Sequence, residues 1–367
     1  MIRGVIVSLL LFFAPALRLC ALEPIAIGSN GKSFVGANSK TPFHPWGFNY
    51  GNRGRLMEDF WNEEWPTIVD DFHEMKAMGA NIVRVHLQFG RFMRGPDEAN
   101  DAALEQLGRL LALAESTGLY LDLTGLACYR TADVPPWYDS LDDDGRWRAQ
   151  ATFWRAVAAR GASSSAIFCY DLMNEPVAPG KKTEKWYPGI LLGGYDFLQL
   201  IAHNPLERAR GELAIAWIDK LTGAIREKDQ KHFITVGMLP WVTGWKHMSG
   251  FVPKDIAPHV DYLSVHIYPK TKRPEEASTA LRECDSGKPV LIEETFPLEC
   301  SVLQLEQFLR DSRAIASGWI FHYDGATIAE YDAAERDGKL TAAQGIWRDG
   351  LRLFARLTPE FAAPVTK

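Results

Sequence analysis

The sequence lacks the patterns that mark several common protein classes. Its 367 residues carry a net charge of −6 and contain no run of lysine or arginine, so no nucleic-acid partner is expected. No GxGxxG or GxxxxGK(S/T) motif is present, which argues against a nucleotide-binding protein. Histidine pairs of the HxH or HExxH kind are absent as well, and we therefore expect neither a metal ion nor a cofactor.

Long hydrophobic runs are scarce, and the one that stands out lies at the N-terminus. Arg3 is followed by an apolar stretch over residues 5–17 and then by a Leu-Cys-Ala sequence that ends at Ala21. This layout is typical of a secretory signal. We therefore assign residues 1–21 as a signal peptide and expect a secreted or periplasmic protein with no membrane insertion after cleavage. Lipid anchoring at Cys20 is a minor alternative, because the leucine before it is large for a lipoprotein signal.

Cysteine is also rare. Five are present, and Cys20 leaves with the signal peptide. The other four show no CxxC or metal-ligand spacing, so two interpretations remain open: one or two disulfides of unknown pairing, or small buried thiols. These four are Cys128, Cys169, Cys284 and Cys300.

What the sequence does contain is a regular alternation of strand-like and helix-like segments. Short apolar, partly β-branched runs predict eight buried strands. They are HPWGFNY, NIVRVHL, LYLDLTGL, AIFCYDLM, HFITVGM, YLSVHIY, PVLIEE and GWIFHY. Helices are predicted near residues 65–78, 104–116, 146–160, 206–228, 275–285, 302–315 and 340–356. This alternation favours an α/β fold, a closed (β/α)8 TIM barrel in which residues 22–367 form a single catalytic domain.

Two glutamates follow predicted strands directly. Glu175 comes after AIFCYDLMN, and Glu294 closes PVLIEE. The carboxyl ends of barrel strands form the mouth in which active sites lie. Two carboxylates at that mouth are the groups that glycoside hydrolysis requires, one as proton donor and the other as nucleophile or base. The 12 tryptophans suit stacking against sugar rings.

Several motifs occur in a fixed order on these strands. They are Arg84 in RVHL, Asn174-Glu175-Pro176, His266 and Tyr268 in VHIYP, and Glu294 in KPVLIEE. Together they resemble glycoside hydrolase family 5, the cellulase and mannanase family, over most of the chain that follows the signal peptide.

The resemblance implies different roles for the two glutamates. Glu175 would be the general acid/base and Glu294 the nucleophile of a retaining mechanism. Glu293 is an alternative nucleophile, but alternation along a strand lets only one of the two face inward, and the family pattern selects Glu294. A neighbouring guanidinium would keep the pKa of the nucleophile low, whereas the acid must hold its proton near neutral pH.

The resemblance also implies a set of substrate-binding residues. Asn174 would bind the 2-hydroxyl of the sugar, and His266 would line the site near the acid/base. Arg84 and Tyr268 would orient the nucleophile. One family feature is missing here, since Thr124 stands where many members carry a histidine at the end of the third strand.

A second missing feature is the tryptophan that usually follows the eighth strand and lies beneath the sugar. His322 lies in that region, within GWIFHYDG. We expect Trp241, which follows the fifth strand, to provide the sugar platform instead. The segment 177–204 is long and rich in Gly, Pro and Lys, and we expect it to form a wall of the cleft with Trp186 or Tyr187 facing the sugar.

These features together predict a secreted retaining β-glycoside hydrolase that acts as a monomer. Its substrate would be a β-glucan or β-mannan type polysaccharide or oligosaccharide, cleaved by double displacement. The alternative is a catalytically weak carbohydrate-binding barrel protein, which the two intact glutamates disfavour. The altered sugar platform leaves the choice between glucan and mannan, and between endo and exo attack, open.

Overall fold

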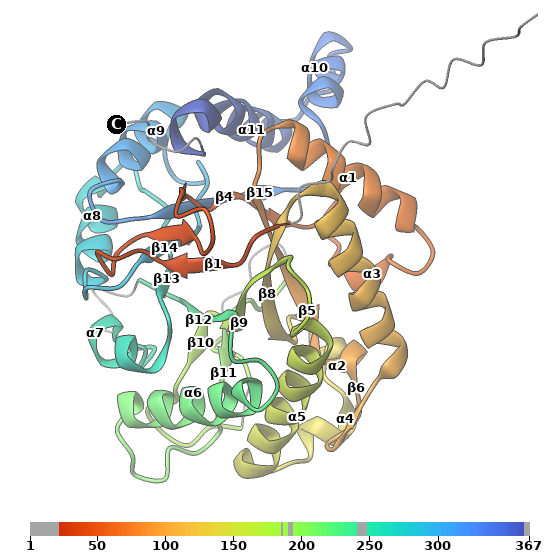
Figure 1. Cartoon of the computed structure of the whole chain (residues 1–367), viewed down its shortest axis with the longest axis vertical. Coiled ribbons are helices and arrows are strands. Elements are labelled where there is room, and N and C mark those ends of the chain that lie inside the picture. The colour runs from red at the N-terminus through yellow and green to blue at the C-terminus, as the bar shows by residue number, and fades with distance from the viewer. Residues whose placement is uncertain (1–21, 185, 190–193, 241–247, 363–367) are drawn as a thin grey trace, which may run out of the picture.

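A closed barrel of eight parallel strands forms the centre of the molecule (Figure 1). The structure, a computed structural model, describes residues 22–184, 186–189, 194–240 and 248–362. The strands are β4 (Trp46–Tyr50), β5 (Ile82–Gln88), β8 (Tyr120–Ala127), β9 (Ile167–Asn174), β12 (Phe233–Met238), β13 (Leu263–His266), β14 (Val290–Glu294) and β15 (Gly318–Tyr323). Around the barrel the strands follow this chain order, with β9 paired to β12. The last strand, β15, pairs with the first, β4, and so closes the barrel. The predicted barrel is confirmed, and each predicted strand coincides with one of the eight.

Helices surround the barrel on its outside (Figure 1). Seven of them match the predicted helices: α1 (Trp65–Ala77), α3 (Asp101–Thr117), α5 (Asp143–Gly161), α6 (Arg210–Arg226), α8 (Pro274–Glu283), α9 (Val302–Ser312) and α11 (Ala342–Phe361). The shorter ones are η1 (Met57–Asp59), α2 (Phe89–Phe92), η2 (Thr131–Asp133), α4 (Pro136–Asp139), α7 (Pro253–Ile256), η3 (Ala257–His259) and α10 (Ile328–Arg336). The sequence did not predict α10, although Thr327 and Glu330 form a capping box at its start.

Glycines end two of the helices and turn the chain back into the barrel. Gly118 follows α3 with φ at 68°, and its amide donates to Ala114. Gly79 lies just after α1 with φ at 97°. Backbone in this left-handed region is the usual C-terminal cap, and glycine adopts it without a Cβ penalty. The chain therefore leaves each helix and enters the next barrel strand within a few residues.

A small antiparallel sheet covers the amino-terminal end of the barrel. It consists of β1 (Ile25–Ile27), β2 (Phe34–Gly36) and β3 (Pro42–Phe43). Phe34 of β2 is fully buried, and its ring lies 5.2 Å from Phe168 and 5.3 Å from Tyr262. This sheet was not predicted, because strands of two or three residues show no measurable periodicity.

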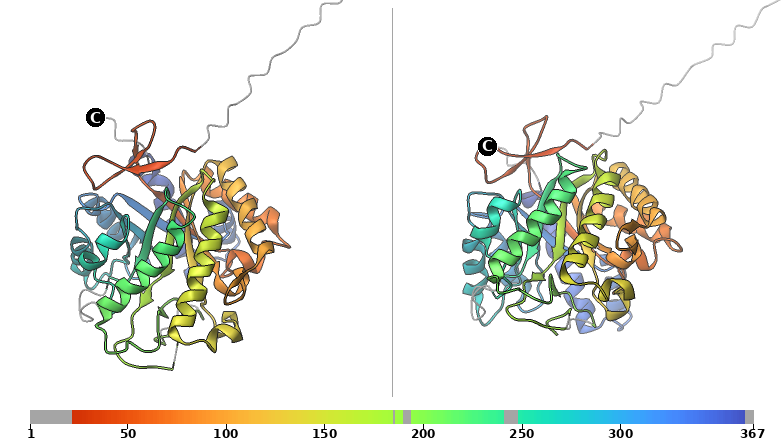
Figure 2. Two further views of the ribbon diagram at one scale, coloured as in Figure 1. Left: turned by 60° about the horizontal axis from the view of Figure 1, so that its bottom comes forward. Right: turned by 90° about the horizontal axis from the view of Figure 1, so that it is seen from below.

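Two further strand pairs lie outside the barrel. β6 (Met93–Gly95) and β7 (Glu98–Ala99) form a hairpin, and β10 (Pro176–Val177) pairs in parallel with β11 (Gln199–Leu200). The second pair ties together the two ends of the long segment after β9. Figure 2 shows this segment and the β1–β3 sheet at opposite ends of the barrel.

The four cysteines in the described residues are free thiols, and three of them are buried. Of the two interpretations, the structure thus favours buried thiols over disulfides. Among the helices that the structure describes, none is both long and apolar enough for a membrane crossing.

Candidate active site

A buried arginine organises the carboxyl-terminal end of the barrel. Arg84, on β5, is fully buried. Its Nη1 donates to Glu294 Oε1 at 2.6 Å and to Asn49 Oδ1 at 2.8 Å. Its Nη2 donates to Asp171 Oδ2 at 2.8 Å and to Asn174 Oδ1 at 3.1 Å. Because a buried charge is tolerated only when it is paired and hydrogen-bonded, this guanidinium fixes four side chains from three strands around itself.

Glu294 has the environment of an ionised nucleophile. One carboxylate oxygen accepts from Arg84, and the other accepts from the hydroxyl of Tyr268 at 2.7 Å. Burial on its own would raise the pKa of Glu294, but the positive charges of His266 and Arg84 outweigh burial and hold this pKa well below its usual range. The carboxylate is therefore charged throughout the neutral and mildly acidic range.

His322 reaches the nucleophile through Tyr268. Its Nε2 lies 2.7 Å from the Tyr268 hydroxyl. Burial lowers the pKa of His322 to about 4, with Glu294 acting in the opposite direction. A neutral imidazole with its proton on Nε2 donates to Tyr268, whose own proton then points to Glu294; this tautomer follows from the hydrogen-bond pattern. His322 was predicted to bind substrate, and its hydrogen bond places it behind Tyr268.

Glu175 lies directly after β9, next to Gly237 of β12. Its amide donates to the Gly237 carbonyl at 2.9 Å, and its φ of 46° is in the left-handed region, which is rare outside glycine. His266 Nδ1 donates to Glu175 Oε1 at 3.0 Å. Burial lowers the pKa of His266, but Glu294 and the hydrogen bonds to Glu175 and Glu293 raise it to about 10, so the ring is a cation.

The two proposed catalytic carboxylates lie close to each other. One oxygen of Glu175, one oxygen of Glu294 and a ring nitrogen of His266 are all within 4.8 Å of one another. The side chains of Glu175 and Glu294 are only 10% and 12% exposed. Glu175 and Glu294, which follow strands far apart in the sequence, thus lie together at the barrel mouth with little exposure to solvent.

Glu293 also faces into the barrel, and the expectation that alternation admits only one of the two glutamates was wrong. Its Oε2 accepts from His266 Nε2 at 3.2 Å and lies 3.5 Å from Arg84 Nη2. The pairing of β13 with β14 shifts register at this point, so His266 pairs with Glu294. Such an irregularity inserts an extra residue and re-aims its neighbours, which lets consecutive side chains reach the same guanidinium.

A second acidic group lies beneath the catalytic pair. Asp122, Asp171 and Glu293 each place a carboxylate oxygen within 4.8 Å of the others, a spacing that a metal ion would accept. Arg84 supplies positive charge to Asp171 and Glu293 here, and it lowers the pKa of Glu293 against the effect of burial. Burial and the charge of Glu293 raise the pKa of Asp122 well above its usual range, which keeps that carboxyl protonated.

Several residues of the site were not assigned a role from the sequence, among them His86 and Tyr129. His86 Nε2 lies 3.2 Å from Arg84 Nη1, and its Nδ1 contacts the hydroxyl of Tyr129. His86 stands two residues after Arg84, so the period of a strand would have placed it on the same face. Tyr129 follows β8 in a loop, where no periodicity marks it.

Three further residues were singled out in the sequence. Trp241 lies outside the described residues. Trp186 stacks on Tyr138 at 5.3 Å and lies over the Arg146 guanidinium, so its contacts are with α4 and α5. Thr124 donates to Asp171 Oδ2 at 2.8 Å and thereby supports the layer beneath the site.

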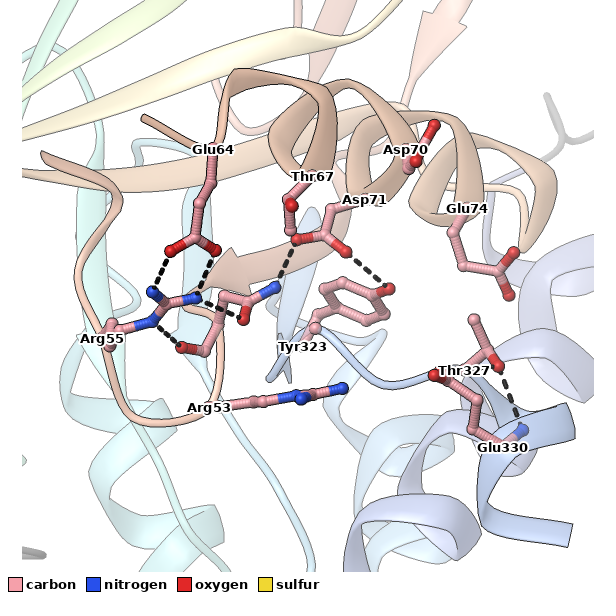
Figure 3. Close-up of a pocket in the computed structure, with 12 residues that line it drawn as sticks. Arg53, Arg55, Glu64, Thr67, Asp70, Asp71, Glu74, Tyr323, Thr327 and Glu330 are labelled. Atoms are coloured by element: carbon pink, nitrogen blue, oxygen red, sulfur yellow. Dashed lines mark hydrogen bonds and ion pairs between the residues drawn. The ribbon is translucent and has the colours of Figure 1, made fainter. Parts of the chain in front are cut away.

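A separate cavity of about 410 Å³ lies outside the barrel, between α1, the turn after β4 and the start of α10 (Figure 3). Its lining includes Arg53, Arg55, Glu64, Asp71 and Glu330. Neither Glu175 nor Glu294 borders it, so it is separate from the candidate active site.

The chain matches the Cellulase (glycosyl hydrolase family 5) family over residues 39–297. No curated protein sequence matches it significantly. Among solved structures it is similar to the exo-beta-1,4-mannosidase Op5Man5 from Opitutaceae bacterium strain TAV5, with 19% identity and a TM-score of 0.66 over 92% of this chain and 62% of that one. It thus spans less than two thirds of that mannosidase.

Two animal enzymes are similar along nearly their whole length. The β-mannanase of the blue mussel Mytilus edulis has 14% identity and a TM-score of 0.65, over 95% of this chain and 99% of that one. The beta-1,4-mannanase of the common sea hare Aplysia kurodai has 12% identity and a TM-score of 0.63, over 93% and 99%. These structures show a shared fold, and the family match covers more than half of the sequence. The chain therefore belongs to glycosyl hydrolase family 5.

Proposed function

We propose that this glycoside hydrolase cleaves β-linked glycans with retention of configuration, using Glu294 as nucleophile and Glu175 as acid/base. The observation that carries the proposal is the separation of the two carboxylates. One oxygen of each lies within 4.8 Å of the other. Retaining enzymes hold their carboxyl groups about 5–5.5 Å apart, whereas inverting enzymes need about 6.5–9.5 Å to admit a water molecule.

The first chemical step joins the sugar to the enzyme. Glu294 attacks the anomeric carbon while the bond to the leaving oxygen breaks, and Glu175 gives its proton to that oxygen. Arg84 and Tyr268 keep the attacking oxygen ionised and aimed. The product is a glycosyl ester of Glu294.

The second step returns the enzyme to its starting state. Glu175, now a carboxylate, removes a proton from water, whose oxygen attacks the anomeric carbon and displaces Glu294. Esterification removes the negative charge of Glu294, and Glu175 can then ionise at a lower cost in free energy. Two inversions give net retention.

β-Mannosides are the substrate class we favour. The similar structures carry the names mannosidase and mannanase, and two family 5 variants were solved with Manβ1-4GlcNAc. β-Glucosides remain the second class, since the matched family is named Cellulase. Parallel hydrolysis of aryl β-mannosides and β-glucosides, then of the corresponding oligosaccharides, measures the preference directly.

The roles of the two glutamates are tested by substitution. Glu294→Ala should abolish hydrolysis of every glycoside. Glu175→Ala should still form the glycosyl ester from a dinitrophenyl glycoside, which needs no proton donor, and azide should rescue the second step by yielding a β-glycosyl azide. Glu227→Gln, an exposed carboxylate paired with Arg155, is the control. NMR detection of the inverted anomer as the first product would refute double displacement.

We also propose that residues 1–21 direct export and that the mature protein is a monomer. Support for export comes from the basic, apolar and small-residue pattern alone. N-terminal sequencing of secreted protein is expected to begin at Leu22, and a lipid-modified Cys20 would instead establish an anchor. Light scattering would measure the oligomeric state.

A further inference from the structure

Part of the segment after β9 crosses the rim of the active-site mouth. Residues 194–198, which we call the rim bridge, run back over the loop that follows β8. The amide of Asp196 donates to the Tyr129 carbonyl at 2.8 Å. The hydroxyl of Tyr195 donates to the carbonyl of Gly54 at 2.5 Å, in the turn that follows β4. The bridge thus connects the loop of the fourth barrel strand to that of the first.

The turn that receives Tyr195 is itself fixed (Figure 3). The Gly54 amide donates to Asp324 Oδ1 at 2.9 Å, after β15. Next to it, Arg55 forms two hydrogen bonds with Glu64, at 2.7 and 3.1 Å. Paired bonds of this kind hold an arginine in one orientation. The hydroxyl of Tyr195 is therefore bonded to a turn that is itself held in place by hydrogen bonds.

A charged side chain supports the bridge from below. The Arg130 guanidinium lies 5.4 Å from the centre of the Tyr195 ring. Arg130 is held in turn by Asp133 at 2.9 Å and by Asp59 at 3.4 Å. A cation over an aromatic ring adds about 0.5–1 kcal/mol at a partly exposed site, so Tyr195 is held by its ring as well as by its hydroxyl.

The inner side of the bridge continues to the catalytic residues without interruption. The Phe197 ring lies 5.0 Å from that of Tyr129, and the Phe197 carbonyl accepts from Asn174 Nδ2 at 3.2 Å. Tyr129 contacts His86, which contacts Arg84. Side chains in contact therefore extend from the guanidinium that holds Glu294 up to the rim.

The order of the strands decides what the bridge obstructs. Glu175 and Glu294 follow β9 and β14, so a glycan passes between these two strands. Around the barrel, β12 and β13 lie on one side of that passage, and β8, β5, β4 and β15 lie on the other. The rim bridge runs from β9 over β8 to β4, and it therefore stands across the second end of the passage.

We propose that this enzyme is exo-acting and removes sugar units from one end of its substrate. A glycan that enters the passage from the side of β12 and β13 meets the rim bridge beyond the two glutamates, so the chain cannot continue past that point. The inference rests on the proposed function, because it assumes that these two glutamates cleave the glycosidic bond.

Product analysis tests the inference on the unmodified mature protein. The probes are β-1,4-linked manno- and gluco-oligosaccharides with an isotopic label at the reducing end. The expected result is one short product of constant length, released from one end only, together with a remainder that shortens by that length at each step. The label shows which end is attacked. A mixture of fragments of several lengths in the first minutes would overturn the proposal. Absence of hydrolysis of these probes and of aryl glycosides would instead refute the proposed function.

A variant tests the bridge itself. Tyr195→Ala removes both the hydroxyl and the ring, and Tyr195→Phe removes only the bond to Gly54. Each should raise the ratio of internal to terminal cuts, by about fivefold for the single hydrogen bond of the Phe variant. Tyr120→Phe is the matched control, because the Tyr120 hydroxyl donates to the Glu23 carbonyl at 2.6 Å at the opposite end of the barrel. Folded variants with an unchanged ratio would show that the bridge does not restrict the substrate.

Discussion

At the residue scale, the site depends on one buried cation and the acceptors gathered around it. Arg84 contacts residues from β4, β9 and β14, and each of these partners would carry an unmatched charge or an unpaired polar atom without it. The chemistry of Glu294 is therefore set by the residues around its carboxylate, and substitutions of these residues are informative.

Tyr268→Phe should slow the reaction without loosening the fold. The variant loses the hydrogen bond that Tyr268 donates to the Glu294 carboxylate at 2.7 Å. A hydrogen bond to a charged group contributes about 1.5–3 kcal/mol, which corresponds to a decrease in kcat/KM of about 10–150-fold. Steady-state kinetics on an aryl glycoside and a thermal melt measure both quantities. An unchanged kcat/KM would mean that Arg84 alone orients the nucleophile.

Glu293→Gln should lower the pKa of His266. Glu293 is one of the groups that raise this pKa to about 10. Since the folded-state pKa lies above the ordinary value of about 6.5, the charged ring contributes stability that is complete below about pH 6.5 and is lost as pH rises further. In the variant the contribution is smaller, and its loss is complete at a lower pH. NMR titration of labelled histidines measures the midpoint directly, and a midpoint equal to that of the unmodified protein would assign the raised pKa to Glu294 and Glu175 alone.

At the element scale, the strands were predictable and their ends were not. Eight apolar runs gave the barrel because each strand is buried on both faces, which leaves a continuous hydrophobic signature. The register shift beside His266 has no such signature, and it is what turns Glu293 inward together with Glu294. In the same way, Tyr129 and Phe197 reach the site from loops, whose course depends on tertiary contacts and not on periodicity.

Gly237 of β12 shows how closely these strand ends approach each other. A Cβ at this position would lie 2.8 Å from Glu293 Oε2 and from His266 Nε2. Gly237→Ala should therefore displace the charged pair and reduce kcat by tenfold or more, about 1.4 kcal/mol in the barrier. Gly223→Ala is the control, since a Cβ there meets nothing within 4 Å, and in the last turn of α6 it should add up to about 1 kcal/mol of stability. Full activity of Gly237→Ala would show that the network can shift without cost.

At the scale of the whole molecule, the residues of the active site and the sheet that covers the barrel lie at opposite ends of the barrel axis. The catalytic groups and the rim bridge lie at the carboxyl ends of the strands, while the β1–β3 sheet closes the opposite end (Figure 2). Between them, the buried layer of Arg84, Asp171 and Glu293 fills the barrel. The family motifs found in the sequence lie toward the carboxyl ends of the barrel strands. They therefore identified the site and did not predict the β1–β3 sheet at the opposite end.

Phe34→Ala should test this separation. The Phe34 ring is fully buried among Phe168, Phe233 and Tyr262 at centroid distances of 5.2–5.6 Å, and its loss leaves a cavity at the closed end. Truncation of a buried phenylalanine costs about 3–5 kcal/mol of folding free energy, so the denaturant midpoint should fall strongly while kcat/KM at 25 °C stays unchanged. Phe43→Ala, at a half-buried ring of the same sheet, should cost less and serves as the matched control. A fall in kcat/KM of Phe34→Ala under conditions where the protein remains folded would show that packing at the closed end is transmitted through the buried layer to Glu294.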